Sequence, residues 1–151
     1  MKVCMQEVKL IYSDPAGWST DMGRCAPLDI SEMYIRSSMS KVIKDKTLIH
    51  EVCHFISNDN SLNLSESQVS TISVMVYKFI MDNRSAQINV ADIHNHIFTH
   101  NNDCSIGMTE MQVAVLAYWL HQWIIDNPTI IDKIAKAEKH FKSNEIGGSN
   151  E

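Results

Sequence analysis

A chain of 151 residues is long enough to bury one hydrophobic core, and a single domain is the simplest expectation. Its hydrophobic content of 44% and charged content of 21% are ordinary for a globular protein. The formal net charge of −5 argues against a general binder of nucleic acid or of anionic membranes, because neither polyanion would be attracted.

The amino terminus and the cysteines favour a reducing compartment. Residues 1–7 become polar too early for the hydrophobic region of a signal peptide, and no apolar run approaches the length of a membrane span. The four cysteines form no Cys-x-x-Cys pair and are widely spaced, at Cys4, Cys25, Cys53 and Cys104. This spacing favours reduced thiols over disulfides or a thiolate zinc site, and we interpret Cys53 as a small buried residue. We therefore expect a cytoplasmic protein without a membrane partner.

The first part of the chain has the patterns of strands. Residues 2–12 alternate imperfectly between apolar and polar side chains, and Asp14-Pro15-Ala16-Gly17 is a turn signal. Residues 23–26 and 33–36 are predicted to be two short strands joined through Pro27-Leu28-Asp29. These patterns predict a small antiparallel sheet ahead of the helices.

The segment from Thr47 to Ile56 carries the strongest chemical signal. Its apolar residues have helical spacing: Leu48, Ile49, Val52, Phe55 and Ile56. On such a helix His50 and His54 lie one turn apart and can present two imidazole nitrogens to one Zn²⁺ ion. Glu51 projects about 100° round the helix from His50, where a general base can reach a water at the metal without being a ligand. The alternative is a pair of histidines satisfied within the core.

A catalytic zinc site needs a third protein ligand. Residues 57–61 form a polar loop in the prediction, and Ser65 is a suitable N-cap for a second helix. Glu66 follows His54 by 12 residues, across the turn between the two helices, and is the candidate ligand. An acidic residue in the first turn also complements the helix dipole, so a structural role is the alternative.

Five segments together carry a family resemblance, and they run in the order Met22-Gly23-Arg24, Met33-Tyr34-Ile35-Arg36, Lys46-Thr47-Leu48-Ile49-His50-Glu51-Val52-Cys53-His54, Leu64-Ser65-Glu66-Ser67-Gln68-Val69 and Tyr77-Lys78-Phe79-Ile80-Met81-Asp82-Asn83. Over roughly residues 3–83 the chain resembles the small zinc-peptidase domains of the ImmA/IrrE type found in bacteriophage and prophage genomes. The resemblance implies a zincin-like core in which His50, His54 and Glu66 hold zinc and Glu51 is the base. Relatives often have two adjacent acids where this chain has Glu66-Ser67.

The resemblance implies a zinc-dependent endopeptidase that acts on a regulatory protein in a bacterial cytoplasm. The alternative is a phage-type protein that keeps a structural zinc and blocks a host protein without proteolysis. Glu51 favours catalysis, since a purely structural zinc site needs no acid at that position. The strand at 23–26 would border the cleft and accept an extended peptide at its edge, or else the sheet only covers the helices.

Beyond Asn83 the chain repeats itself. Residues 49–83 align without a gap to residues 93–127, and eleven of these 35 positions are identical. One helix–loop–helix unit used twice would explain this, and chance similarity of two amphipathic helix pairs is the alternative. The second copy has no glutamate after its first histidine. We therefore favour a structural lid or interface as the role of the second copy. The alternative is a second metal site formed by His94, His96, His100 and Glu110.

The complete prediction is an α+β fold with a small N-terminal antiparallel sheet followed by about five helices. Residues 1–85 would form the zincin-like domain, 86–142 a helical extension packed on it, and 143–151 a flexible tail. Residues 109–126 are apolar around most of the helix, which predicts burial on several sides or contact with another chain, including a homodimer. The expected partner is a protein or peptide.

Overall fold

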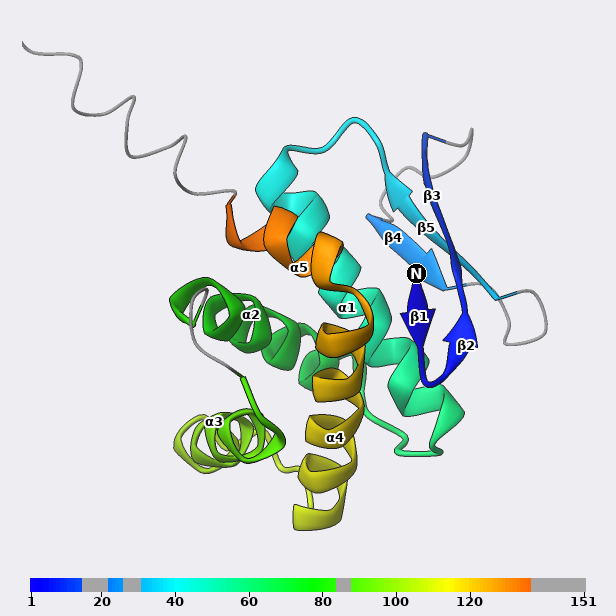
Figure 1. Cartoon of the computed structure of the whole chain (residues 1–151). Coiled ribbons are helices and arrows are strands. Elements are labelled where there is room, and N and C mark those ends of the chain that lie inside the picture. The colour runs from blue at the N-terminus through cyan, green and yellow to red at the C-terminus, as the bar shows by residue number, and fades with distance from the viewer. Residues whose placement is uncertain (15–21, 26–30, 84–87, 137–151) are drawn as a thin grey trace, which may run out of the picture.

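The computed structural model of the chain describes residues 1–14, 22–25, 31–83 and 88–136. Within them the class is α+β, as predicted: strands at the N-terminus are followed by five helices (Figure 1). The predicted tail, 143–151, and the end of the last predicted helix lie outside the described residues. None of the helices in these ranges is long and apolar enough to cross a membrane.

The strands form two small sheets. β1 (Lys2–Val3) and β2 (Gln6–Glu7) pair as an antiparallel hairpin, and the second sheet has the order β3-β5-β4. In it β4 (Gly23–Cys25) is antiparallel to β5 (Glu32–Arg36), as expected for residues 23–26 and 33–36, whereas β3 (Lys9–Ser13) runs parallel to β5. β4 therefore runs opposite to both β3 and β5, and β5 lies between the other two strands.

The single strand predicted over residues 2–12 is broken near its start. Cys4 and Met5 take positive φ angles of 47° and 65°, which end β1 and turn the chain back into β2. Non-glycine residues rarely adopt such angles outside turns, so nothing in the side chains at these two positions predicts the break.

Five helices complete the fold, and they are α1 (Lys41–Asp59), α2 (Glu66–Asp82), α3 (Val90–Asp103), α4 (Glu110–Asp126) and α5 (Pro128–Ala135). Side chains cap the first four: Ser40 accepts from the backbone N–H of Ile43, and reciprocal capping boxes begin α2, α3 and α4. Asn127-Pro128 separates α4 from α5, and Pro128 is tolerated there because the first position of a helix needs no backbone donor.

One hydrophobic core runs through both halves of the chain. Buried side chains of β5, α1, α2, α3, α4 and α5 belong to a single cluster. Asn127 ties the two ends together, since its side chain accepts from the N–H of Lys2 at 2.9 Å and donates to its carbonyl at 2.7 Å. The described residues of the predicted extension, 86–142, therefore share their core with those of 1–85.

The apolar helix α4 owes its composition to burial on several sides. It contacts α1, α3, α5 and β1, and its most buried side chains include Val113, Leu116, Leu120 and Trp123. The outward side keeps three exposed apolar residues, which are Met111, Tyr118 and Ile125. Contact with a second copy of the chain through this helix stays a prediction.

Helix ends and loop angles recur at the repeat offset found in the sequence. α1 and α3 end at Asp59 and Asp103, and α2 and α4 span equivalent residues. In the connecting loops Ser61 and Ser105 have φ angles of 52° and 51°. The two helix–loop–helix units thus share their backbone course.

Each unit holds the loop of the other through an equivalent glutamine. The side-chain amide of Gln68 donates to the carbonyl of Ile106 at 3.2 Å, and that of Gln112 donates to the carbonyl of Leu62 at 2.8 Å. Gln112 and Ile106 are the repeat equivalents of Gln68 and Leu62. Such an exchange of matching contacts is typical of two-fold symmetric pairs, so the units pack around an approximate two-fold axis.

Trp123 provides a test of the shared core. Its side chain is 1% exposed, and its Nε1 finds no hydrogen-bond partner among the described residues. Trp123→Ala is expected to lower the free energy of unfolding by about 3–5 kcal/mol, measured by urea denaturation. Trp123→Phe is the control, because it keeps most of the ring and loses no hydrogen bond. A change of under about 1 kcal/mol in Trp123→Ala would contradict this packing.

Candidate metal centre

Helix α1 carries two histidines on the side that faces α2. The opposite side of α1 is buried in the core and includes Leu48, Ile49, Val52, Phe55 and Ile56, as the spacing predicted. This burial fixes the rotation of the helix. The side chains of His50 and His54 are then left at the rim, 20% and 26% exposed.

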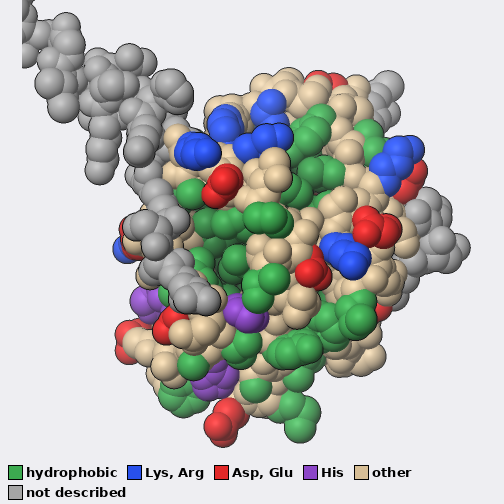
Figure 2. All heavy atoms as spheres, viewed as in Figure 1, with side chains coloured by type: hydrophobic (Ala, Val, Ile, Leu, Met, Phe, Trp, Pro, Cys, Tyr) green, Lys and Arg blue, Asp and Glu red, His purple; other side chains and the backbone are tan. Residues whose placement is uncertain are grey.

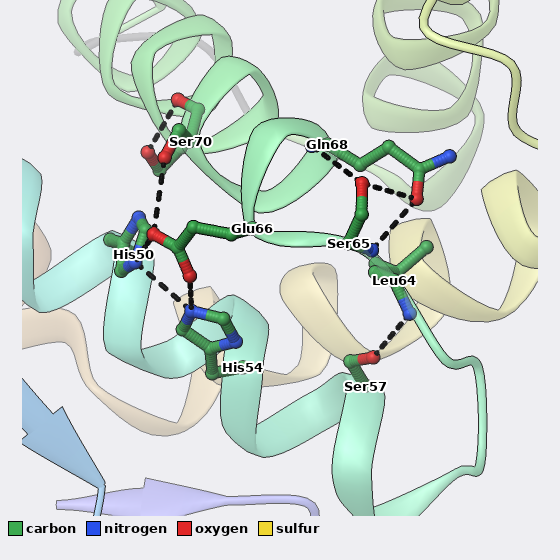
Figure 3. A network of polar contacts seen from close by, with 9 residues as sticks. His50, His54, Ser57, Leu64, Ser65, Glu66, Gln68 and Ser70 are labelled. Atoms are coloured by element: carbon green, nitrogen blue, oxygen red, sulfur yellow. Dashed lines mark hydrogen bonds and ion pairs between the residues drawn. The ribbon is translucent and has the colours of Figure 1, made fainter.

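The loop between α1 and α2 brings Glu66 back to these histidines. The hydroxyl of Ser57 accepts from the backbone N–H of Leu64 at 3.1 Å, and the Ser65–Gln68 capping box starts α2 directly afterwards (Figure 3). Glu66 is the first residue of α2, so its carboxylate reaches across to α1. A hydroxyl four residues later, on Ser70, lies 3.4 Å from its Oε1.

Three potential ligand groups, two imidazoles and one carboxylate, form a compact triangle. The Nε2 atoms of His50 and His54 are 3.0 Å apart, Glu66 Oε2 lies 2.9 Å from His54 Nε2, and Glu66 Oε1 lies 3.1 Å from His50 Nε2 (Figure 3). A tetrahedral zinc ion with bonds of about 2.0–2.1 Å separates its ligand atoms by roughly 3.3 Å. One ligand atom from each of the three residues lies within 4.8 Å of the other two, so the group is close enough together to surround one ion.

Hydrogen bonds alone cannot satisfy all the polar atoms of this triangle well. If both rings carried a hydrogen on Nε2, two hydrogens would share a gap of 3.0 Å. If only one did, the lone pair of the other ring would lie close to the carboxylate of Glu66. A single cation between the three groups accepts lone pairs from all of them, so this cluster can hold a metal ion.

Electrostatics favour the neutral, metal-binding form of His50. Burial lowers the pKa of its imidazole, and the neighbouring ring of His54 lowers it further, against the opposing effect of Glu66. A histidine must be neutral to coordinate a metal, so at neutral pH these surroundings leave its lone pair available.

Glu51 lies beside the triad on the same cavity. Its side chain is 5% exposed, and β4 packs closely over it. A Cβ atom built on Gly23 would lie 2.7 Å from Glu51 Oε1 and 2.6 Å from Thr47 Cγ2, so any larger residue here would force these side chains or the strand to shift. This close approach fixes the distance between the edge of the sheet and the candidate base.

The cavity itself lies between β4, α1 and α2 and has a volume of about 810 Å³. His50, His54 and Glu66 line it together with Glu51 and Gly23. This volume lies within the range of natural ligand pockets.

The second unit does not reproduce the triad. Among the described residues His50, His54 and Glu66 are the one group of three metal-binding side chains that come together, and Glu110 gathers with none of His94, His96 and His100. The equivalent of His54 is Phe98, whose ring stacks on His94 at 5.9 Å. His96 Nε2 instead lies 3.3 Å from the carbonyl of Met75, and its ring packs on Phe79. The option of a second metal site finds no support in these residues.

Cys53 is fully buried and is the small core residue that the sequence indicated. Burial, and secondarily the charge of Glu51, raises the pKa of its thiol to about 12. The thiolate that a metal would require is therefore strongly disfavoured.

Two neighbours of the triad were not predicted. Ser70 follows Glu66 by one helical turn, and that spacing is a signal that could have indicated the contact. Gly23 gives no such signal, because its approach to Glu51 depends on how the sheet packs against α1.

Comparisons with models of known protein families, with curated protein sequences and with solved structures find no match to this chain.

Proposed function

We propose that the protein is a zinc-dependent endopeptidase of the ImmA/IrrE-like phage type, acting on a regulatory protein. One observation carries the proposal: the triangle of His50, His54 and Glu66 lines the same cavity as the buried carboxylate of Glu51. Two imidazoles and one carboxylate are the ligand set of known peptidases with catalytic zinc, and they leave a fourth position open. A structural zinc site is normally closed by four protein ligands.

The chemistry that these residues support is hydrolysis of an amide bond. Zinc at this site would polarise the scissile carbonyl and lower the pKa of a water there. Glu51 would take the proton from that water and deliver it to the leaving nitrogen. The C–N bond breaks, one water is consumed, and a new carboxyl terminus and a new amino terminus form.

The edge of β4 is the proposed docking site for the substrate backbone. Among the described strands β4 pairs only with β5, which leaves its other edge available to an extended peptide. Because Gly23 lies against Glu51, a peptide added at this edge would have its backbone near the candidate base.

Gly23→Ala tests this placement. The added methyl group must displace the carboxylate of Glu51 or lift β4 away from α1, since it would approach both Thr47 and Glu51 to less than 3.0 Å. We expect cleavage to fall by about 10²-fold with unchanged zinc content. Gly107→Ala is the control, because a Cβ there meets no atom within 4 Å, and it should cost stability but not cleavage. Full activity in Gly23→Ala would disprove the assigned contact.

The alternative function is a zinc-containing protein that blocks a host protein without cutting it. The exposed apolar residues Met111, Tyr118 and Ile125 of α4 favour it, because they offer a surface beyond the cavity. Either function would operate in a bacterial cytoplasm, where free thiols such as Cys4, Cys53 and Cys104 persist.

Peptide profiling tests the proposed activity. Zinc-loaded protein is incubated with a library of proteome-derived peptides, and new termini are identified by mass spectrometry. We expect discrete cleavage sites that disappear after chelation and return when zinc is restored. No new termini from fully metallated protein, with both library and intact cytoplasmic extract, would rule out a general endopeptidase activity.

A further inference from the structure

Lys46 is a cation that lines the cavity. It lies on α1 one helical turn before His50, and its side chain is directed across to α2, with Nζ 5.3 Å from the centre of the Tyr77 ring. That distance is within the range of a cation–π contact, which holds the ammonium group in place. Within the described part of the chain no carboxylate forms an ion pair with it.

The cavity around Lys46 has aliphatic walls. Ile43 of α1 and Val74 of α2 both line it, and they are 43% and 51% exposed. A side chain with a short aliphatic stem and a terminal carboxylate matches this combination, because its stem would contact the two walls and its charge would meet the ammonium group.

The charge around the start of α1 and the end of α5 also favours an acidic side chain in the substrate. The start of α1 adjoins the end of α5, where the ammonium group of Lys41 donates to the carbonyl of Lys133 at 2.8 Å. Residues 41–46 and 128–136 together contain five lysines and two aspartates. Basic side chains gather in the upper part of the face shown in Figure 2. An overall acidic protein thus has a locally basic end next to the cavity.

We propose that Lys46 selects an acidic residue, glutamate or aspartate, at one of the two positions that flank the scissile bond. This inference rests on the proposed peptidase function and adds the substrate class to it. His50 belongs to the metal triad and lies one turn, about 6 Å, along the helix from Lys46. We therefore place the acidic residue next to the scissile bond, where its carboxylate could meet the ammonium group.

The test compares peptides that differ by one charge. A peptide cleaved by the zinc-loaded protein is made with Glu or Gln at each of the two flanking positions in turn. We expect kcat/KM to be roughly tenfold higher for Glu at one of them, the effect of a partly solvated hydrogen bond between charged groups. Lys46→Gln should remove this preference, and Lys46→Glu should reverse it in favour of Lys. Lys78→Gln is the control, because it removes an equal charge from α2 outside the cavity and should keep the preference.

A binding measurement separates this inference from the proposed function. Zinc-loaded Glu51→Gln protein is titrated by calorimetry with the Glu and Gln forms of one peptide, so that no turnover is needed. If no peptide is cut but the Glu form binds more tightly through Lys46, the peptidase function fails and the acidic selectivity stands. If peptides are cut or bound with equal efficiency in both forms, or if Lys46→Glu leaves the preference unchanged, Lys46 is not a specificity residue. Absence of both cleavage and binding overturns the two proposals together.

Discussion

Replacing His50 or His54 with alanine is expected to lower bound zinc from about one ion per chain to nearly none, as measured by elemental analysis after dialysis. Either change removes one corner of a triangle whose sides are 2.9–3.1 Å, and two remaining ligands cannot retain the ion against a competing buffer. Zinc should raise the melting temperature of the wild-type protein but not of these variants, because only a folded binding site gains stability from the metal.

A matched control comes from the second pair of histidines. His96 and His100 also lie one turn apart, and their rings make the same 4.6 Å contact as those of His50 and His54. Their double alanine variant should keep the full zinc content, because no carboxylate among the described residues completes a metal-binding group with them. Zinc retained in His54→Ala and lost in the double variant would place the metal in the second unit instead.

Glu51→Gln is expected to abolish cleavage while leaving the metal and the fold in place. The substitution keeps the shape of a side chain that is 5% exposed and removes its ability to take a proton. We expect a loss of roughly 10²–10⁴-fold in kcat, the usual contribution of general acid–base catalysis. The measurement pairs the cleavage rate with zinc content and melting temperature at matched protein levels.

The same variant separates the two candidate functions. A peptidase loses its biological effect together with cleavage in Glu51→Gln, and His54→Ala behaves alike. A protein that acts by binding keeps its effect in Glu51→Gln and loses it only when the metal ligands are removed. If metallated Glu51→Gln kept full biological function, the zinc would have only a structural role.

The proximity of His50, His54 and Glu66 could be predicted because it depends mainly on local structure. His50 and His54 are one turn apart on a helix whose apolar stripe fixes its rotation, so their shared direction follows from spacing. Glu66 required only that the short loop after α1 reverse the chain. Ser65 also marked the start of α2 in the sequence as an N-cap, and the structure adds a capping box with Gln68.

Other features depend on contacts that no local pattern encodes. One such feature is the parallel pairing of β3 with β5, which places Lys9 opposite Glu32. It depends on β4, which comes between these strands in the sequence and is antiparallel to β5. The apolar pattern of α4 predicted burial, but not that the indole of Trp119 would donate to Asn60 of the first unit at 2.8 Å. The proposed roles of Gly23 and Lys46 depend on residues that become their neighbours only in the folded chain.

Zinc K-edge X-ray absorption on the metallated protein tests the central claim most directly, because it reports which atoms hold the ion. The triad predicts a first shell of nitrogen and oxygen at about 2.0–2.1 Å with outer-shell scattering from two imidazole rings, and no sulfur. The outer-shell signal should fall by half in any residual zinc-bound His54→Ala protein. A sulfur shell at about 2.3 Å, which would assign a thiolate such as Cys53, or scattering from three or more imidazoles, would contradict a centre built from His50, His54 and Glu66.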